Sequence, residues 1–421
     1  MVERRHPPPL GRGGARRRAP VTGPLAPENV NEVTRVLDLS GVFVNGTLGG
    51  VLARDRRLDL FGFLAIGIVS GLGGGITRDA LPVREETGLP YASTAEAADS
   101  SGRQVPVAHA CGHDMHVTCL LGAAELMARA RGPWQGTLLA LFQPGEEPGD
   151  GADRMLGDGL TGRVPRPDVA FAQHVLPYPA GWVGTRAGSF LSAADNLRIT
   201  VHGRGAHGSA PQAAVDPVVM AAMIVVRLQT VVSRELAATR PAVLTVGSVR
   251  AGTSSNVIPD SAELLVNVRS YDEGTRRTVL AAVRRIVGAE CAASGAPREP
   301  EFEEGTRFPP TVNDEAVTAE VSAAFREVFG KDAGTAELQS SSEDFSRIPD
   351  AFGIPYTYWA VGCADPDTYR DALRRGTVSQ DVPVNHSPRF APVLRPTLDT
   401  GVRALVTAAL TRLGKPEGAG R

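Results

Sequence analysis

The sequence predicts an α/β protein interrupted by a compact α+β unit. From residue 79 onward, apolar runs of strand length alternate with segments whose apolar residues recur at helical spacing. Between residue 192 and about residue 305 the order changes to strand, helix, strand, strand, helix, and a final strand follows near Glu301. That order suits an antiparallel sheet with two helices on one face. A chain of 421 residues is also long for a single core. We therefore expect residues 79–191 and 307–421 to form one domain in two parts, with residues 192–306 inserted between them as a lid.

The individual elements follow from periodicity and from flanking turn residues. In the first part of the domain we expect a helix at 117–131 and strands at 136–142 and 169–174. In the inserted unit the expected strands are 197–202, 243–249 and 262–268, and the expected helices are 217–236 and 273–292. The last part should hold a helix at 315–329, a strand at 355–361 and a final helix at 394–413.

The first 33 residues are rich in arginine, proline and glycine and hold few apolar side chains. Such a composition cannot bury a core, so we expect a disordered basic tail. The alternative of a basic arm for nucleic acid is weaker, because no aromatic residues are interleaved with the arginines. The formal net charge of the chain, -2, gives no argument for a nucleic-acid partner.

Residues 34–78 form a glycine-rich apolar segment that differs from the rest of the chain. Two uncharged runs, 39–53 and 60–77, are separated by the charged residues of 54–59. The second run is just long enough to span a bilayer, which predicts membrane contact. The alternative is a buried glycine-rich hairpin in a soluble core. A secretory signal is not expected, because the apolar run starts late and no small-residue cleavage site follows it.

The densest chemistry in the chain lies at residues 109–116, which contain three histidines and one cysteine. Thiolate and imidazole are good ligands for zinc and related metals. Cys111 and His113 are two residues apart, so a turn before the following helix can aim both at one ion. The alternative is a polar turn with a buried cysteine.

Two adjacent glutamates, Glu146 and Glu147, follow an apolar run and sit between Pro-Gly turns. Their side chains diverge, so one can bind metal while the other takes a proton from a metal-activated water. Adjacent glutamates are also common on solvated surfaces, and that interpretation remains open from the sequence.

Three further histidines complete the candidate site. His174 ends an expected strand and His386 lies in the loop before the last helix. With Cys111, His113 and Glu147 they supply five ligands, enough for two ions that share a bridging group. His207 lies among glycines of the inserted unit, where it either stabilises an oxyanion or is an exposed loop residue.

The four cysteines are scattered and do not form a disulfide framework. This usage fits a reducing compartment, so we expect a cytoplasmic protein, with membrane association through residues 34–78 left open.

Several motifs resemble one enzyme family. They are DALPVREETGLPYAS, HACGHDMH, FQPGEEPGDGA, GRGAHGSAPQAAVDPV, NVIPD, SSEDFS and NHSPRF, in that order over about residues 79–413. This part of the chain is similar to the di-metal amidohydrolases and aminoacylases, which include hippurate hydrolases and N-acyl-amino-acid amidohydrolases. The resemblance implies a zinc-peptidase-like, three-layer catalytic domain with a ferredoxin-like lid that often dimerises. It also implies cleavage of small N-acyl amino acids with two divalent ions, of zinc, manganese or cobalt.

The resemblance assigns roles to residues one by one. Cys111, His113, Glu147, His174 and His386 match the metal positions, and Glu146 matches the general base. Asp79 matches an aspartate that orients a metal-ligand histidine. His207 matches a lid histidine that polarises the scissile carbonyl, and Asn256 and Arg269 match positions that hold a substrate carboxylate. The residues before Arg269 depart somewhat from the family pattern.

The N-terminal region departs more seriously. Where the family has a helix and strands, this chain has residues 34–79, which resemble one repeat of glycine-rich bacterial membrane proteins related to trimeric intracellular cation channels. We therefore expect an N-terminally incomplete catalytic domain in a chimeric chain. Two alternatives to an active enzyme follow: an inactive or weakly active fusion that associates with membranes, and a binding protein that keeps metal without turnover.

Overall fold

The computed structural model describes residues 81–98 and 102–415. The expected tail at 1–33, the glycine-rich segment at 34–78 and Asp79 lie outside these residues. Among the described residues, the candidate site is built around a mixed four-stranded sheet in the order β13-β4-β14-β3. Strand β14 pairs parallel with β3 and antiparallel with β4, and β13 pairs parallel with β4. The strands are β13 (Ala333–Thr335), β4 (Val183–Thr185), β14 (Tyr356–Ala364) and β3 (Ala170–Pro179).

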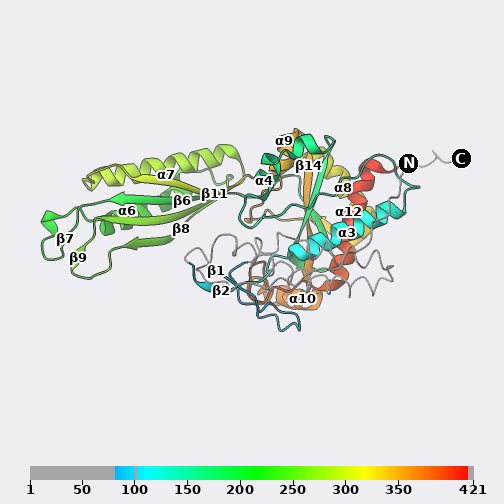
Figure 1. Ribbon diagram of the computed structural model, residues 1–421, viewed down its shortest axis with the longest axis horizontal. Helices are drawn as coiled ribbons and strands as arrows, with labels where there is room; N and C mark the ends of the chain where they lie inside the picture. Colours follow the sequence, from blue (N-terminus) through cyan, green and yellow to red (C-terminus); the bar gives the residue numbers. More distant parts are fainter. Residues whose placement is uncertain (1–80, 99–101, 416–421) are drawn as a thin grey trace, which may run out of the picture. The chain divides into compact units, whose positions relative to one another are not determined.

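Three helices pack against one face of this sheet (Figure 1). They are α3 (His113–Arg129), α8 (Glu315–Phe329) and α12 (Leu394–Leu413). Met115, Phe325 and Leu398, one from each helix, share a buried cluster with Trp359 and Val361 of β14. Trp359 is fully buried, and burying an aromatic of this size contributes on the order of 2–3 kcal/mol. The packing fixes the N-terminal end of α3 beside β3, where the candidate ligands lie.

The other face of the sheet is covered by short elements. Leu176 of β3 and Tyr358 of β14 pack there with Phe190 of β5. A satellite cluster joins Ala152 of α4 to Ile348 of α9. The elements on this side are α4 (Gly151–Gly157), α5 (Leu160–Arg163), α9 (Arg347–Phe352), β5 (Gly188–Leu191) and β12 (Thr311–Asn313), and the last two pair antiparallel.

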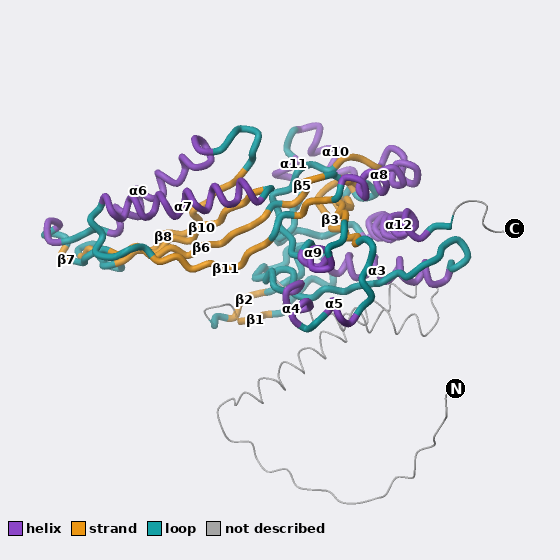
Figure 2. The backbone as a smooth tube through the Cα atoms, turned by 90° about the horizontal axis from the view of Figure 1, so that it is seen from above, coloured by secondary structure: helices purple, strands orange, loops and turns teal. Residues whose placement is uncertain are grey.

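Residues 193–308 form an antiparallel unit, shown in Figures 1 and 2. Its sheet has the order β11-β6-β10-β8, and both of its long helices pack on the same face. Along β10 every second residue is buried, which places Leu264 and Val266 against the helices. The elements are β6 (Ala193–His202), α6 (Pro217–Thr230), the π-helical turn η2 (Val231–Glu235), β8 (Ala242–Ala251), β10 (Ser261–Ser270), α7 (Glu273–Ala293) and β11 (Glu301–Phe308).

The element order predicted for this unit is therefore present. Helices α6 and α7 begin where aspartates cap them, because the side chain of Asp216 accepts from the amide of Val218 and that of Asp272 accepts from Thr275. Whether the unit acts as a lid remains a prediction.

The remaining elements are short. They are β1 (Glu96–Ala98), β2 (Gln104–Pro106), β7 (Ala206–His207), β9 (Val257–Ile258), η1 (Pro211–Ala213), η3 (Gly330–Asp332), α10 (Pro366–Arg375) and α11 (Val378–Asp381). Strand β1 pairs with β2, and β7 pairs with β9.

The strand predicted at 136–142 is wrong. Over the residues that the structure describes, this apolar segment pairs with no other strand, and Leu139 and Phe142 are 41% and 39% exposed. A strand is defined by its hydrogen-bonded neighbours, which an apolar run alone does not supply. The helix predicted at 117–131 also begins earlier, at His113, so the ligand cluster itself opens the helix.

Candidate metal centre

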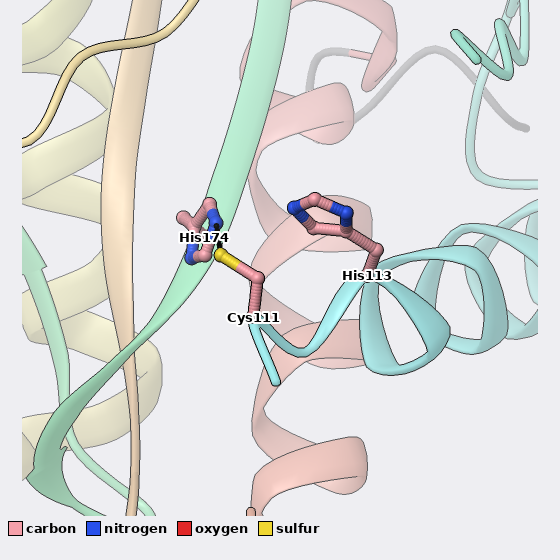
Figure 3. Close-up of side chains that lie close together, drawn as sticks. All are labelled: Cys111, His113 and His174. Atoms are coloured by element: carbon pink, nitrogen blue, oxygen red, sulfur yellow. Dashed lines mark hydrogen bonds between the residues drawn. The ribbon is translucent and has the colours of Figure 1, made fainter. Parts of the chain in front are cut away.

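The turn before α3 places Cys111 and His113 on either side of a glycine. Gly112 caps the helix in the left-handed conformation, with φ of 88°. A Cβ atom at this position would lie 2.4 Å from Cγ2 of Val175, so the turn can approach β3 this closely only with glycine. The close approach brings Sγ of Cys111 to 3.5 Å from Nε2 of His174 (Figure 3).

His174 is oriented by a backbone carbonyl. Its Nδ1 lies 2.8 Å from the carbonyl oxygen of Val175, to which it donates, and this leaves the lone pair of Nε2 directed toward Cys111. Burial lowers the pKa of His174 to about 4. Burial likewise lowers the pKa of His113 to about 4. Both rings are therefore neutral at pH 7, the form that binds a metal ion.

The loop between residue 143 and α4 carries the two glutamates. The amide of Gly149 donates to the carbonyl of Glu146, and that of Gly151 donates to the carbonyl of Gly145. These turns aim the two carboxylates differently. Oε2 of Glu146 lies 3.5 Å from Nε2 of His113, whereas Oε1 of Glu147 lies 3.3 Å from Nε2 of His386 and 4.0 Å from Nε2 of His113. Glu147 is thus the carboxylate placed between two imidazoles.

Electrostatics favour ionised Glu147. Burial alone would raise the pKa of this carboxyl group, but the hydrogen bond and charge of His386 outweigh burial and lower it. The same hydrogen bond raises the pKa of His386.

His386 has an unusual backbone. Its φ of 71° is the one positive value for a residue other than glycine among the described residues. This conformation is unfavourable for a residue with a Cβ, and it persists where the surroundings hold it in place. Here the amide of His386 donates to the carbonyl of Ala110, which ties the His386 loop to the turn that carries Cys111.

Asn385 joins three parts of the site, and sequence analysis did not single it out. Its Nδ2 donates to the carbonyl of Cys111 (2.9 Å) and to the carbonyl of Val175 (3.1 Å). One side-chain amide therefore links the loop of His386, the turn of Cys111 and the strand of His174. Its place next to His386 was the only signal in the sequence.

The donor atoms fit metal ions. The ligand atoms lie within 4.8 Å of one another in each of three sets: Cys111, His113 and His174; Cys111, Glu147 and His386; and His113, Glu146 and Glu147. In addition, Nε2 of His113 is buried and makes no hydrogen bond with any residue that the structure describes. Sulfur, imidazole and carboxylate together suit zinc best among common divalent ions.

The thiol of Cys111 also points to a cation. Burial raises the pKa of this thiol well above its usual range, and the charges of Glu147 and Glu146 raise it further. A buried thiol beside two carboxylates becomes a thiolate only if a positive ion compensates the charge.

The candidate residues of the antiparallel unit lie apart from this cluster. His207 and Asn256 are neighbours at the β7–β9 strand pair, where the amide of Gly208 donates to the carbonyl of Asn256. Strand β6 runs ten residues, roughly 30 Å, between that end and Ser192, whose amide donates to Ser341 of the mixed-sheet part. The structure therefore does not bring His207 and Asn256 to the five candidate ligands.

Arg269 lies at the opposite end of the unit from His207. It is on β10, opposite Ala194 of β6. Its Nη1 donates to Oγ of Ser342 (2.6 Å) and its Nε donates to Oδ1 of Asn267 (2.9 Å). The three residues predicted to contact substrate are thus divided between two ends of one unit.

Comparison with known proteins gives two family matches. The family model described as peptidase family M20/M25/M40 matches residues 78–372. The model described as glycine transporter matches residues 35–91, which fits the predicted glycine-rich membrane-protein resemblance of that segment.

Three curated proteins show the level of similarity. Thermostable carboxypeptidase 1 of Saccharolobus solfataricus is 35% identical over 68% of this chain and 69% of its own length. N-acetyl-L-cysteine deacetylase of Bacillus subtilis is 36% identical over 66% of this chain and 64% of its own length. Hippurate hydrolase of Campylobacter jejuni is 35% identical over 60% of this chain and 63% of its own length. The match thus spans about two thirds of these relatives.

Two crystal structures share the fold. An aminohydrolase from methicillin-resistant Staphylococcus aureus superposes with a TM-score of 0.65 at 30% identity, covering 79% of each chain. A Bacillus subtilis structure described as a dinuclear metal-binding peptidase of the M20 family superposes with a TM-score of 0.60 at 28% identity, also covering 79% of each chain.

Proposed function

Because this chain belongs to peptidase family M20/M25/M40 and is a metal-dependent hydrolase of that family, we propose that it cleaves the amide bond of N-acyl amino acids. The observation that carries the proposal is the convergence of five candidate ligands from four separate stretches of chain. Cys111 and His113 open α3, Glu147 lies in the 143–152 loop, His174 lies on β3 and His386 precedes α12.

Two divalent ions would be held by Cys111, His113, Glu147, His174 and His386. Oε1 of Glu147 lies 4.0 Å from Nε2 of His113 and 3.3 Å from Nε2 of His386, which supports including this carboxylate among the ligands. When bound, such ions polarise an amide carbonyl and make a water molecule more acidic. Zinc suits the thiolate best, and manganese and cobalt are the alternatives to compare with it.

Glu146 is the candidate general base. Oε2 of its carboxylate lies 3.5 Å from Nε2 of His113, whereas Glu147 lies between two imidazoles. A carboxylate in that place can accept a proton from the attacking water and return it to the departing amine. The division of roles follows from the different directions in which the 143–152 loop aims the two side chains.

The substrate class rests on the names of relatives and on one cation. Three relatives are named as an N-acetyl-L-cysteine deacetylase, a hippurate hydrolase and an N-acyl-L-amino acid amidohydrolase. A product amino acid carries a carboxylate, and Arg269 offers a partly buried guanidinium beside Ser342 to bind it. Asn256 is proposed to assist Arg269, and His207 is proposed to polarise the scissile carbonyl.

A second copy of the chain would reconcile His207 and Asn256 with this role, because both lie far from the centre within one chain. Helix α6 exposes Val219, Met223 and Val226, which are 59%, 47% and 66% exposed. The adjacent sheet ends at β8, whose outer edge has no partner among the described residues. We propose that this face forms a homodimer. Val226→Glu should shift the mass measured by light scattering from dimer to monomer, and a monomeric wild-type protein would refute the dimer.

The helical segment 217–235, which includes α6, is long and apolar enough to cross a membrane by length and composition alone. However, the side of α6 opposite to Val219, Met223 and Val226 packs in the core of the antiparallel unit. Binding of the isolated protein to lipid vesicles, lost in Val226→Glu, would assign the exposed face to a membrane instead of a second copy.

The test of the main proposal is a hydrolysis assay with metal analysis. Protein loaded with zinc, manganese or cobalt is assayed on hippurate and on a panel of N-acetyl amino acids, with Glu146→Gln as the matched control. Hydrolysis by the wild type and its loss in Glu146→Gln would support the proposal. Bound metal without hydrolysis of any substrate would instead support a binding protein.

A second candidate function is a fusion with little activity that associates with membranes through residues 34–78. The glycine transporter match at 35–91 favours it, and the finer relationship to trimeric intracellular cation channels belongs to this candidate. Fractionation of cells distinguishes the two locations: the cysteine usage predicts recovery in the cytoplasm, and the fusion candidate predicts recovery with membranes. Loss of hydrolysis alone does not distinguish them.

A further inference from the structure

Two adjacent acidic residues between β13 and α9 are buried and are not among the candidate ligands. Glu343 is 7% exposed and Asp344 is fully buried. Burying a carboxylate is unfavourable unless hydrogen bonds compensate, so the partners of these two groups indicate what they do.

Asp344 connects the two ends of the 143–152 loop. Its Oδ1 accepts a hydrogen bond from Nε2 of Gln143 (2.5 Å), and its Oδ2 accepts one from the amide of Ala152 (2.9 Å). Gln143 is the first residue of the loop, and Ala152 lies in the first turn of α4, where the loop ends. Glu146 and Glu147 lie between these two contacts. One buried carboxylate therefore joins the two ends of the loop that carries Glu146 and Glu147. We call its two hydrogen bonds, to Gln143 and to Ala152, the stem contacts.

Glu343 anchors this carboxylate to the mixed sheet. Its Oε1 accepts from the amides of Asp344 (3.0 Å) and Phe345 (3.1 Å), and its Oε2 accepts from the hydroxyl of Tyr358 (2.9 Å). Tyr358 lies on β14 opposite Ala172, two residues before His174 on β3. The path from Tyr358 through Glu343 to Asp344 thus connects the strand pair that carries His174 to the loop that carries the glutamates.

Two further backbone hydrogen bonds of the loop are internal to it. The amides of Gly149 and Gly151 donate to Glu146 and Gly145, which are inside the same loop. Such contacts shape the turn but do not fix its position relative to β3. Arg347 adds a contact at the α4 side, because its Nη1 lies 2.5 Å from Oδ2 of Asp153.

We propose that Asp344 is a positioning residue, which holds the 143–152 loop so that the carboxylates of Glu146 and Glu147 meet His113 and His386. This inference rests on the proposed function and deepens it. Displacement of a reacting group by about 1 Å can lower a rate about 100-fold. Loss of the stem contacts should therefore lower the rate of hydrolysis, although Asp344 contacts neither the substrate nor a candidate ligand.

The test compares Asp344→Ala with Asp344→Asn. Asparagine can keep both contacts. Its Oδ1 accepts from the amide of Ala152, and its Nδ2 donates to Oε1 of Gln143 once the side-chain amide of Gln143 has rotated by about 180°. Alanine can keep neither. We expect Asp344→Ala to lower kcat about 100-fold with KM changed only a few-fold, and Asp344→Asn to remain within about fivefold of wild type.

A second readout does not depend on activity. Titration of metal-free protein with cobalt, followed by visible absorption, should show affinity lowered about 10- to 100-fold in Asp344→Ala and little changed in Asp344→Asn. Gln143→Ala removes the partner of one stem contact and should also lower the affinity for cobalt. Because Asp344→Ala already removes the contact that Gln143→Ala removes, the double variant should be no worse than Asp344→Ala.

Asp314→Ala is the matched control. Asp314 caps α8 through the amide of Val317 and lies outside the loop, so its loss lowers stability without moving the glutamates. Equal losses of kcat and cobalt affinity in Asp314→Ala and Asp344→Ala, at equal loss of thermal stability, would refute the proposal. So would wild-type cobalt affinity in Asp344→Ala.

The outcomes separate this inference from the proposed function. If wild-type protein hydrolyses nothing in the panel, the proposed function fails, and the cobalt titration still decides the role of Asp344. If Asp344→Ala does not fold, Gln143→Ala and Asp344→Asn decide it, and unchanged cobalt affinity in Gln143→Ala refutes the proposal.

Discussion

The amide of Val175 donates a hydrogen bond to Nε2 of His116 at 3.0 Å. His116 is therefore committed to the backbone of β3, next to His174, although it lies in the same eight-residue cluster as Cys111 and His113. A histidine can serve the centre by supporting the strand of a ligand instead of binding metal.

His116→Leu should accordingly keep the metal and lose stability. The substitution leaves the amide of Val175 without its acceptor in a buried place, which costs about 1–3 kcal/mol. We expect the free energy of unfolding in urea to fall by that amount while metal content stays as in wild type. His113→Ala is the contrast, because it should lose metal. Loss of metal to the same extent in both variants would make His116 a ligand.

Cys111→Ser should weaken metal binding more than Cys119→Ser or Cys363→Ser. All three cysteines are buried and free, but only Cys111 lies within 4.8 Å of imidazole and carboxylate ligand atoms. Metal analysis after dialysis measures the difference. Equal metal content in the three variants would remove the cysteine from the site.

Glu146→Gln and Glu147→Gln should separate the base from the ligand. Glu146→Gln should keep metal and lose about 10²–10⁴-fold in kcat, since proton transfer by a placed carboxylate contributes that much. Glu147→Gln should lose metal, because its carboxylate lies between His113 and His386. Metal content and kcat are measured on the same preparations. Identical behaviour of the two variants would contradict the assignment of roles.

Acid should destabilise the metal-free protein through His113 and His174. Their pKa values fall from 6.5 in an open chain to about 4 in the fold, so the unfolded state binds more protons below pH 6.5. The stability due to each neutral ring is complete above pH 6.5 and is lost as the pH falls toward about 4, at roughly 3 kcal/mol each. Urea unfolding between pH 7.5 and 4 measures this slope. His174→Asn should flatten it, and an unchanged slope would show that the ring is not held neutral.

Deletion of residues 1–70 should improve solubility and leave metal binding unchanged. The five candidate ligands lie between residues 111 and 386, and the deleted part is the basic tail with most of the glycine-rich segment. Solubility after lysis and the metal content of the purified protein are measured. If the deletion variant loses all metal while the full chain binds it well, the glycine-rich segment has become part of the catalytic fold.

Much of the fold was predictable because the patterns were local. The alternation along β10 and the aspartate caps of α6 and α7 are written in neighbouring residues. The strand expected at 136–142 shows the limit, because the apolar pattern is present but the neighbour that would make it a strand is not found among the described residues. Pairing is a property of two segments, and one segment does not reveal it.

In the candidate site, the ligand residues were predictable from the sequence, but the residues that hold them in place were not. Ligand types are conspicuous in the sequence, so Cys111, His113 and His386 could be selected before their distances were known. Asn385 and Asp344 could not, because amide and carboxylate groups are common and their importance here comes from contacts over long separations. Asp344 meets Gln143 across 201 residues, and Asn385 meets Cys111 across 274. Asn256 and His207 remain predictions whose test requires the oligomeric state.

The distribution of ligands along the chain has a consequence for biosynthesis. Cys111 and His386 are separated by 275 residues, which a ribosome adds in roughly 14 to 55 s at about 5–20 residues per second. By the end of that interval the nascent chain contains a thiol, two histidines and a glutamate of the candidate site but still lacks His386, the fifth ligand. The whole antiparallel unit is also synthesised before His386. Metal capture by the complete donor set therefore follows translation of the whole antiparallel unit and of residue 386. A cell short of metal would accumulate a finished chain with an uncompensated cluster of buried polar groups, which is the kind of chain that quality-control proteases remove.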